Sequence, residues 1–336
     1  MKTGVLLVNL GTPDSTEVGD VRKYLREFLS DKRVIDIPAI SRWMLVNLII
    51  APFRAPKSAA EYKRLFTERG SPLKYYTEDL LEPLRGMLGA DYAVEYAMRY
   101  QSPSIQLGLD KLRAQHVGKI HVIPLFPQYA SASTGSVIDK VMEITKDWQI
   151  IPEIKFTSQF LEEDKFLQVI VNNGKKWMAK TDYDHFVFSY HGLPERQILK
   201  GSVGKQCQLG TCCHQFHDRN RYCYRAQCYQ TTRLLAGKLG IPEEKYTVCF
   251  QSRLGRDPWI KPYTDHVLEE LPASGKKKVL AFSPAFVSDC LETTVEVGET
   301  YKEDFIKAGG EQWDLVESLN DDPLWIECLA DLVRRG

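Results

Sequence analysis

Short apolar runs alternate with amphipathic stretches along almost the whole chain. Seven or eight of these runs predict buried strands, at 5–10, 92–98, 119–126, 153–156, 185–190, 246–251, 278–283 and 313–317. Apolar residues at helical spacing separate most of them, at 21–29, 104–116, 136–147, 162–179, 225–239, 259–271, 290–308 and 322–335. Because strand–helix alternation is typical of parallel sheets covered by helices on both faces, we expect an α/β fold.

The number of predicted strands favours two similar domains over one wide sheet. We place the first domain at 1–155 and the second at 156–319, and leave open whether a helix at about 320–336 packs back onto the first. Ser15 or Thr16 is the expected cap of the first helix. In such folds ligands bind at the carboxyl ends of strands, and often between domains. The segments that follow the strands are therefore where functional residues are expected.

Composition excludes several classes of protein. The 336 residues include 44 basic and 44 acidic side chains, and this zero net charge argues against non-specific nucleic-acid binding. No apolar run reaches the ~18–20 residues of a membrane span. The apolar run 5–10 leads into Gly11-Thr12-Pro13 without a small-residue cleavage site, which is typical of a first strand and not of a signal peptide. We therefore expect a cytoplasmic protein with reduced thiols.

One segment, 43–53, is apolar except for Asn47 and lies between Arg42 and Arg54. It is too short to span a bilayer. Three interpretations remain open, namely a core helix, the apolar lip of a pocket, and an interfacial membrane contact with basic flanks.

The second half of the chain carries candidate catalytic groups after its strands. His191 follows a predicted strand and precedes Gly192, which permits close approach of a ligand to the backbone. Four acidic residues spaced by 4, 3 and 4 predict one carboxylate stripe on a helix, formed by Glu292, Glu296, Glu299 and Glu303. A solvated helix face is the alternative. Carboxylate oxygens with one imidazole suit Fe²⁺, whereas the G-x-S-x-G pattern of serine hydrolases is absent.

Five of the eight cysteines lie within 22 residues, in an expected insert at 201–228. They are Cys207, Cys212, Cys213, Cys223 and Cys228. The spacing differs from that of a zinc ribbon, and four thiolates can hold zinc or a [2Fe–2S] cluster, with idle thiols as a third alternative. Adjacent Cys212 and Cys213 are expected to point differently, so only one of them is expected to ligate. Cys249 and Cys328 are predicted core residues.

Several long motifs, in order along nearly the whole chain, resemble those of ferrochelatases, the enzymes that insert Fe²⁺ into a porphyrin. They are VLLVNLGTP at 5–13, RGSPL at 69–73, MRY at 98–100, FPQYASASTGS at 126–136, SYHGLPER at 189–196, FQSRLGRDPWIKPYTD at 250–265 and FVSDCLETTVE at 286–296. The resemblance implies two Rossmann-like chelatase domains, with a porphyrin cleft between them and no nucleotide site.

The same resemblance implies site residues. His191 and Glu292 would face each other across the macrocycle as catalytic groups and ligands of the Fe²⁺ substrate, with catalytic Glu296 behind Glu292. An implied porphyrin-binding set comprises Asn9, Thr12, Pro13, Arg99, Tyr100, Tyr129, Ser131 and Ser133. Candidate partners of the propionates are Arg99, Arg196, Arg253 and Lys261. Segment 43–53 falls where the family has an apolar lip, which in some members contacts the membrane.

The expected activity is insertion of Fe²⁺ into protoporphyrin IX with release of two protons, and coproporphyrin III is the alternative substrate. A non-catalytic tetrapyrrole-binding protein and an iron–sulfur redox sensor on the same scaffold are alternatives from other classes. The cysteine segment resembles the internal type that holds a [2Fe–2S] cluster. Cys290 stands where some members have His and is assigned no role. We expect a monomer or homodimer that binds porphyrin and Fe²⁺ but no nucleic acid, located in the cytoplasm or peripherally on the inner face of the membrane.

Overall fold

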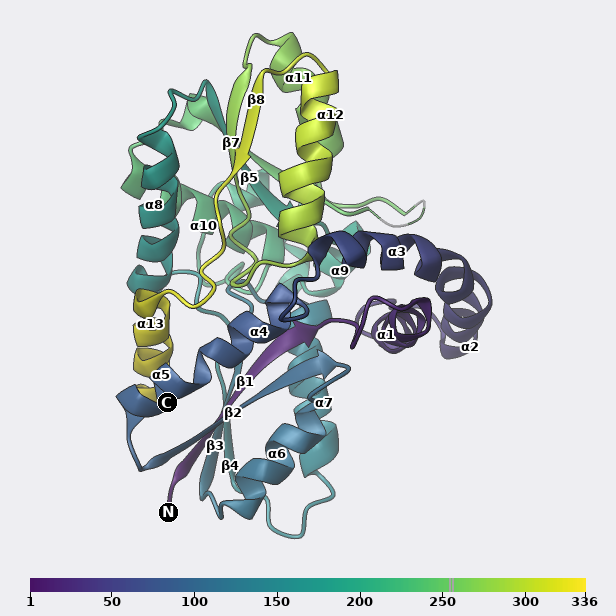
Figure 1. Cartoon of the computed structure of the whole chain (residues 1–336), viewed down its shortest axis with the longest axis vertical. Coiled ribbons are helices and arrows are strands. Elements are labelled where there is room, and N and C mark those ends of the chain that lie inside the picture. The colour runs from purple at the N-terminus through teal and green to yellow at the C-terminus, as the bar shows by residue number, and fades with distance from the viewer. Residues whose placement is uncertain (254, 256) are drawn as a thin grey trace. The chain divides into compact units, whose positions relative to one another are not determined.

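The computed structural model describes residues 1–253, 255 and 257–336, and these residues form two four-stranded parallel sheets (Figure 1). The first sheet has the order β2-β1-β3-β4, with β1 at Thr3–Gly11, β2 at Tyr92–Tyr100, β3 at Lys119–Pro124 and β4 at Glu153–Phe156. The second has the order β6-β5-β7-β8, with β5 at His185–His191, β6 at Tyr246–Gln251, β7 at Lys278–Phe282 and β8 at Gln312–Leu315. The predicted α/β class with parallel sheets is confirmed.

The chain divides into two compact units, each containing one sheet. Unit 1 comprises Met1–Phe126, Ala130–Ser158 and Asp321–Gly336, and unit 2 comprises Pro127–Tyr129 and Gln159–Asn320. The last helix, α13 at Pro323–Arg334, belongs to unit 1, where it packs against α5 at Leu81–Leu88. The predicted boundary between independently folding domains at 155/156 stays a prediction.

The remaining helices of unit 1 are α1 at Val18–Ser30, α2 at Ala39–Met44, α3 at Ala51–Leu65, α4 at Pro72–Asp79, α6 at Ile105–Ala114 and α7 at Ser136–Thr145, with π-helices η1 at Leu45–Ile50 and η2 at Ser131–Gly135. A core that includes Leu6, Leu109 and Val122 joins helix to sheet. Helix α1 buries the predicted apolar stripe. Its cap is Glu17, so the expected cap at Ser15 or Thr16 is wrong; the Ser15 hydroxyl instead accepts the Glu17 N–H at 3.1 Å.

Unit 2 contains α8 at Asp164–Met178, α9 at Glu195–Lys200, α10 at Tyr224–Leu239, α11 at Thr264–Ala273 and α12 at Tyr301–Lys307, with short 3₁₀ turns η3 at Val203–Lys205, η4 at Thr211–Cys213 and η5 at Glu243–Lys245, and a π-helix, η6, at Leu291–Thr300. Its core includes Val187, Cys249 and Trp313. Cys249 of unit 2 and Cys328 of unit 1 are both buried, so the prediction that they are core residues is confirmed.

The apolar segment 43–53 continues from α2 through η1 into α3, and its large side chains face solvent. Trp43, Leu48, Ile49 and Phe53 are between 56% and 80% exposed, whereas Val46 is fully buried. A core helix would bury this face, so that interpretation is wrong. Among the described residues, no helix combines the length and the apolar character that crossing a bilayer requires.

The two units share one plan in detail. Each second strand is followed by a residue in the left-handed region, Gln101 at φ 67° after β2 and Ser252 at φ 66° after β6. Each third strand leads into a π-helix, η2 after β3 and η6 after β7. Such helices are rare and occur most often at functional sites. Both units therefore depart from regular structure at the same edge of their sheets, where parallel α/β folds bind ligands.

Candidate active site

His191 is the last residue of β5, and the peptide unit that follows it is held on both sides. The carbonyl of His191 accepts a hydrogen bond from the Tyr224 phenol at 2.9 Å, and the Gly192 N–H donates to the Gln251 carbonyl at 2.8 Å. A Cβ at position 192 would lie 2.8 Å from that carbonyl, so only glycine fits without a shift. Within the described residues the imidazole of His191, which is partly exposed, makes no hydrogen bond.

The carboxylate of Glu296 is held by neutral donors. The Ser252 hydroxyl lies 2.8 and 2.7 Å from its two oxygens, the Gln251 amide donates at 3.1 Å, and the Tyr301 phenol donates at 2.9 Å. No basic side chain of the described residues pairs with it. The negative charge is therefore stabilised by hydrogen bonds but not neutralised, which suits a carboxylate that binds a cation or a proton.

Gln251 connects the candidate catalytic groups. It is paired with His191 in the register of β5 and β6, and its amide also donates to the backbone carbonyl of Glu292 at 3.2 Å. Glu292 and Glu296 both lie in η6, which follows β7 on the other side of β5. The structure thus brings His191, Glu292 and Glu296 to one edge of one sheet.

Burial and the neighbouring Glu296 carboxylate raise the pKa of Tyr301 far above its usual range. The phenol is therefore a proton donor to Glu296 throughout the physiological pH range.

The predicted four-carboxylate stripe is wrong beyond Glu296. Residues 291–300 are π-helical, and i→i+5 bonding puts more residues in each turn than the 3.6 of an α-helix. A spacing of 4, 3 and 4 then no longer keeps Glu299 and Glu303 on the face of Glu292. Glu303 is exposed in α12 and pairs with Lys307 at 3.7 Å.

Sequence reasoning missed the three residues that hold Glu296. Gln251 and Ser252 end a predicted strand and lie within the motif at 250–265, so the rule of searching strand ends pointed to them. Tyr301 had no such signal, because its contact depends on the π-helical pitch of η6.

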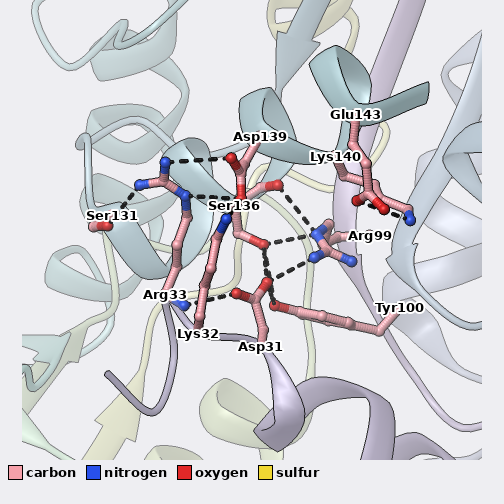
Figure 2. Close-up of polar contacts among 10 residues, drawn as sticks. All are labelled: Asp31, Lys32, Arg33, Arg99, Tyr100, Ser131, Ser136, Asp139, Lys140 and Glu143. Atoms are coloured by element: carbon pink, nitrogen blue, oxygen red, sulfur yellow. Dashed lines mark hydrogen bonds and ion pairs between the residues drawn. The ribbon is translucent and has the colours of Figure 1, made fainter. Parts of the chain in front are cut away.

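Unit 1 places a different polar cluster at the equivalent edge (Figure 2). The Arg99 guanidinium donates to Asp31 at 2.7 Å and to the Ser136 hydroxyl at 2.6 Å, and the Tyr100 phenol donates to Asp31 at 2.9 Å. The Asp31 side chain is 5% exposed and that of Arg99 13%. Burial opposes the Asp31 charge, but hydrogen bonds from Ser136 and the Arg33 backbone, with the Arg99 charge, lower its pKa below the ordinary value.

Other members of the predicted porphyrin-binding set also have protein partners. The Arg33 guanidinium donates to the Ser131 hydroxyl at 3.2 Å, and the Asn9 amide donates to Thr77 at 3.0 Å. Thr12 is buried, and its hydroxyl has no hydrogen-bond partner in the part of the chain that the structure describes. A Cβ at Gly11, beside it, would lie 2.0 Å from the Tyr100 carbonyl, so this turn requires glycine.

The porphyrin-binding set is divided between the units. Tyr129 belongs to unit 2, where its N–H donates to Gln227 at 2.7 Å and its ring packs edge-on against Tyr222 at 5.7 Å. The other seven residues, Asn9, Thr12, Pro13, Arg99, Tyr100, Ser131 and Ser133, belong to unit 1. The set as a whole stays a prediction.

Four of the five clustered cysteines, Cys207, Cys212, Cys213 and Cys223, line a cavity of about 620 Å³. They form two hydrogen-bonded pairs, Cys207 with Cys212 and Cys213 with Cys223. The bond from Cys213 lowers the pKa of Cys223, and the same bond together with burial raises that of Cys213. Within residues 1–253, 255 and 257–336, no three metal-binding side chains converge on one point.

The fifth cysteine, Cys228, lies apart from this cavity. It is fully buried on α10, where its thiol contacts the Tyr224 phenol, and burial raises its pKa well above the usual range. Cys212 and Cys213 both reach the cavity, contrary to the expectation that adjacent cysteines diverge.

The comparisons with known proteins agree with this geometry. SirB from Bacillus subtilis, solved with Fe³⁺, aligns over 100% of this chain and 95% of its own, with a TM-score of 0.55 and 12% identity. That likeness shows the fold, which is the α/β chelatase fold. The family model for ferrochelatase matches residues 2–336. The ferrochelatase of Legionella pneumophila (strain Lens) is 45% identical over 333 residues, covering 99% of both chains. That of Coxiella burnetii (strain Dugway 5J108-111) is 42% identical over 340 residues, covering 100% of this chain and 94% of its own.

The fold and the residues at its edge therefore define a metal chelatase, an enzyme of the lyase class. The chain belongs to the ferrochelatase family, and its activity is one of haem biosynthesis.

Proposed function

We propose that this chain inserts Fe²⁺ into protoporphyrin IX, with His191, Glu292 and Glu296 as the catalytic residues. The observation that carries the assignment is the edge of the second sheet, where Gln251 joins the strand pair of His191 to the helix of Glu292 and Glu296. Family membership over the full chain supports the iron and porphyrin substrates.

The chemistry requires the loss of two pyrrole protons. Two N–H bonds break, bonds form between Fe²⁺ and the porphyrin nitrogens, and both protons leave the macrocycle. A neutral imidazole at His191, whose ordinary pKa of ~6.5 allows it to accept a proton at neutral pH, takes a pyrrole proton. A bent macrocycle exposes its nitrogen lone pairs better than a flat one, so binding that distorts the ring lowers the barrier.

Glu296 supplies negative charge where the metal and protons must pass. Neutral hydrogen-bond donors fix its position, and no described cation competes for its charge. Glu292 lies one residue into the same π-helix. Hard carboxylate oxygens bind Fe²⁺ without the tight hold of thiolates, which suits a metal that must be released into the ring.

An anaerobic assay of Fe²⁺ or Zn²⁺ insertion into protoporphyrin IX tests the function. We expect turnover by the intact protein, with protoporphyrin IX used better than other porphyrins. Binding of the porphyrin without any metallation would overturn the enzyme assignment and leave a tetrapyrrole carrier.

We also propose that Cys207, Cys212, Cys213 and Cys223 hold a [2Fe–2S] cluster. They fit the group, since four thiols line one cavity and the Arg225 guanidinium, which contacts Cys213, is a buried cation beside a group that carries net negative charge. The thiol pairs must converge when the cluster binds. When bound, the cluster supplies one-electron redox chemistry, which metal insertion does not use, so its role here is structural or sensory.

An anaerobic preparation distinguishes the metal. We expect visible absorption together with iron and acid-labile sulfide, all lost in Cys212→Ser and retained in Cys228→Ala, whose residue lies outside the cavity. A colourless, iron-free wild-type protein would count against the cluster, and stoichiometric zinc would replace it as the bound group.

The exposed apolar face of Trp43, Leu48, Ile49 and Phe53 is proposed as the lip of the porphyrin site and as a peripheral membrane contact. Basic Arg54 and Lys57 follow on the next turns, both exposed, and would face anionic lipid headgroups. Co-sedimentation with vesicles of anionic lipid should fall in Leu48→Asp and remain in Met142→Asp, which places the same charge at an exposed apolar residue elsewhere in unit 1. Equal binding by the two variants would exclude this contact.

A further inference from the structure

The first turn of α10 lies between the cysteine segment and the peptide unit of His191. Cys223 is the residue that precedes this helix, and its thiol pairs with Cys213 on the cavity wall. Tyr224, the first helical residue, is buried and donates from its phenol to the His191 carbonyl at 2.9 Å. Two adjacent residues thus have different tasks, one at the thiols and one at the candidate catalytic strand.

The next residues make the connection stiff. Arg225 donates to the Gly210 carbonyl at 3.0 Å within the cysteine segment, and to the Lys261 carbonyl at 3.2 Å. The Cys228 thiol, one turn along the helix, contacts the Tyr224 phenol. Tyr224 is therefore fixed from both ends, and a displacement of the helix start would move its phenol.

We propose that Tyr224 is a positioning residue for His191, and that through it the cysteine segment controls the geometry of the catalytic imidazole. The inference rests on the proposed function of His191. The physical reason is that Tyr224 holds the carbonyl side of the peptide unit whose N–H is held by Gln251. Fixing both sides of that unit restricts the backbone torsion that aims the His191 side chain.

The chain offers a matched control at the preceding residue of β5. Tyr190 is also fully buried, and its phenol also spans the sheet and α10, bonding the Thr232 hydroxyl at 2.9 Å, but without touching the His191 carbonyl. Tyr224→Phe and Tyr190→Phe each remove one buried hydroxyl and one hydrogen bond. A merely structural role would give the two variants the same effect.

Kinetics and an amide signal test the positioning. We expect Tyr224→Phe to lower kcat by about ten-fold with KM for porphyrin unchanged, since aim of a proton acceptor matters in the transition state, whereas Tyr190→Phe should leave kcat within about two-fold. The NMR signal of the Gly192 amide, measured at fixed pH, should shift in Tyr224→Phe only. Equal kinetic effects, or an unmoved Gly192 signal, would overturn the proposal.

A double-mutant cycle tests the control by the cysteine segment. Cys213→Ser should lower kcat and shift the Gly192 signal in the wild-type and Tyr190→Phe backgrounds, and do neither in Tyr224→Phe. The same Cys213→Ser effect in all three backgrounds, or none in any, would refute the link. Inactive wild-type protein would defeat the proposed function alone, because the Gly192 signal still reports on the Tyr224 contact.

Discussion

Unit 1 and unit 2 have the same strand order but use a carboxylate at the equivalent edge in opposite ways. In unit 1, Asp31 is buried against the Arg99 guanidinium at 2.7 Å and is further held by hydroxyl groups. In unit 2, Glu296 is held by Gln251, Ser252 and Tyr301, all of them neutral. One carboxylate has its charge cancelled and the other keeps it.

The difference teaches which of two similar clusters is available for chemistry. A buried ion pair such as Asp31–Arg99 stabilises a fold only while both partners remain, because either charge alone is costly to bury. A carboxylate fixed by neutral donors has the geometry of a binding site and an unspent charge. By this comparison unit 2 supplies the reactive groups, and the Asp31 cluster of unit 1 holds its loops in place.

The largest expected effect sharpens the comparison at its reactive end. His191→Ala should reduce metal insertion by about 10²–10⁴-fold, the range for loss of a general base. The fold should persist, because the imidazole makes no hydrogen bond within the described residues. Turnover and circular dichroism check the two halves, and near-normal turnover would remove His191 from the mechanism.

The next effect contrasts the two carboxylates directly. Glu296→Gln keeps the shape of the side chain but removes its charge, so turnover should fall by about 10²-fold while unfolding free energy changes by less than about 1 kcal/mol.

Asp31→Asn should do the reverse. Removing one partner of a buried ion pair leaves the Arg99 charge uncompensated and should cost about 3 kcal/mol of unfolding free energy. Denaturant titration and turnover of the folded fraction measure both quantities. Similar stability losses in Asp31→Asn and Glu296→Gln would break the distinction between the units.

A smaller effect tests where the units are alike. His121 on β3 and His185 on β5 are both buried, and their Nε2 atoms lie 2.8 Å from the hydroxyls of Thr157 and Thr247. Burial lowers the pKa of each to about 4, helped by nearby lysines. Between pH 6.5 and 4 the unfolded chain therefore binds protons that the folded chain refuses, so stability falls as pH falls through this window.

Each histidine should contribute roughly 1–2 kcal/mol of this loss between pH 7 and 5. His121→Gln and His185→Gln should each flatten the pH dependence of unfolding by a similar amount. A change in one variant only would show that the units differ here as well.

The smallest effect concerns the support of Glu296. Tyr301→Phe removes one of its neutral donors and should lower turnover by about five- to ten-fold, with little effect on stability. Ser252→Ala should have an effect of the same size, since its hydroxyl reaches both carboxylate oxygens. Full activity in both variants would mean that the position of Glu296 does not matter.

Much of this could be predicted from local pattern. Apolar runs and helical spacing located the strands, and the strand-end rule led to His191 and to the acidic segment at 292–296. Several helices between residues 51 and 88 lacked a clear prediction, because their apolar positions are divided among contacts with α1, η1, β2 and α13. The apolar segment 43–53 illustrates the same limit, since exposure of Trp43 and Phe53 depends on what the rest of unit 1 does not cover.

The sequence by itself determined the α/β class, the family and the candidates His191, Glu292 and Glu296, because periodicity and motif order are local properties of the chain. The tertiary structure decided which charges are already cancelled, as in Asp31 with Arg99, and which remain, as in Glu296. It also decided that η6 is a π-helix and that Tyr224 meets the His191 carbonyl. Partners of these kinds are 5 to 68 residues apart in the chain, so only folding brings them within hydrogen-bond distance.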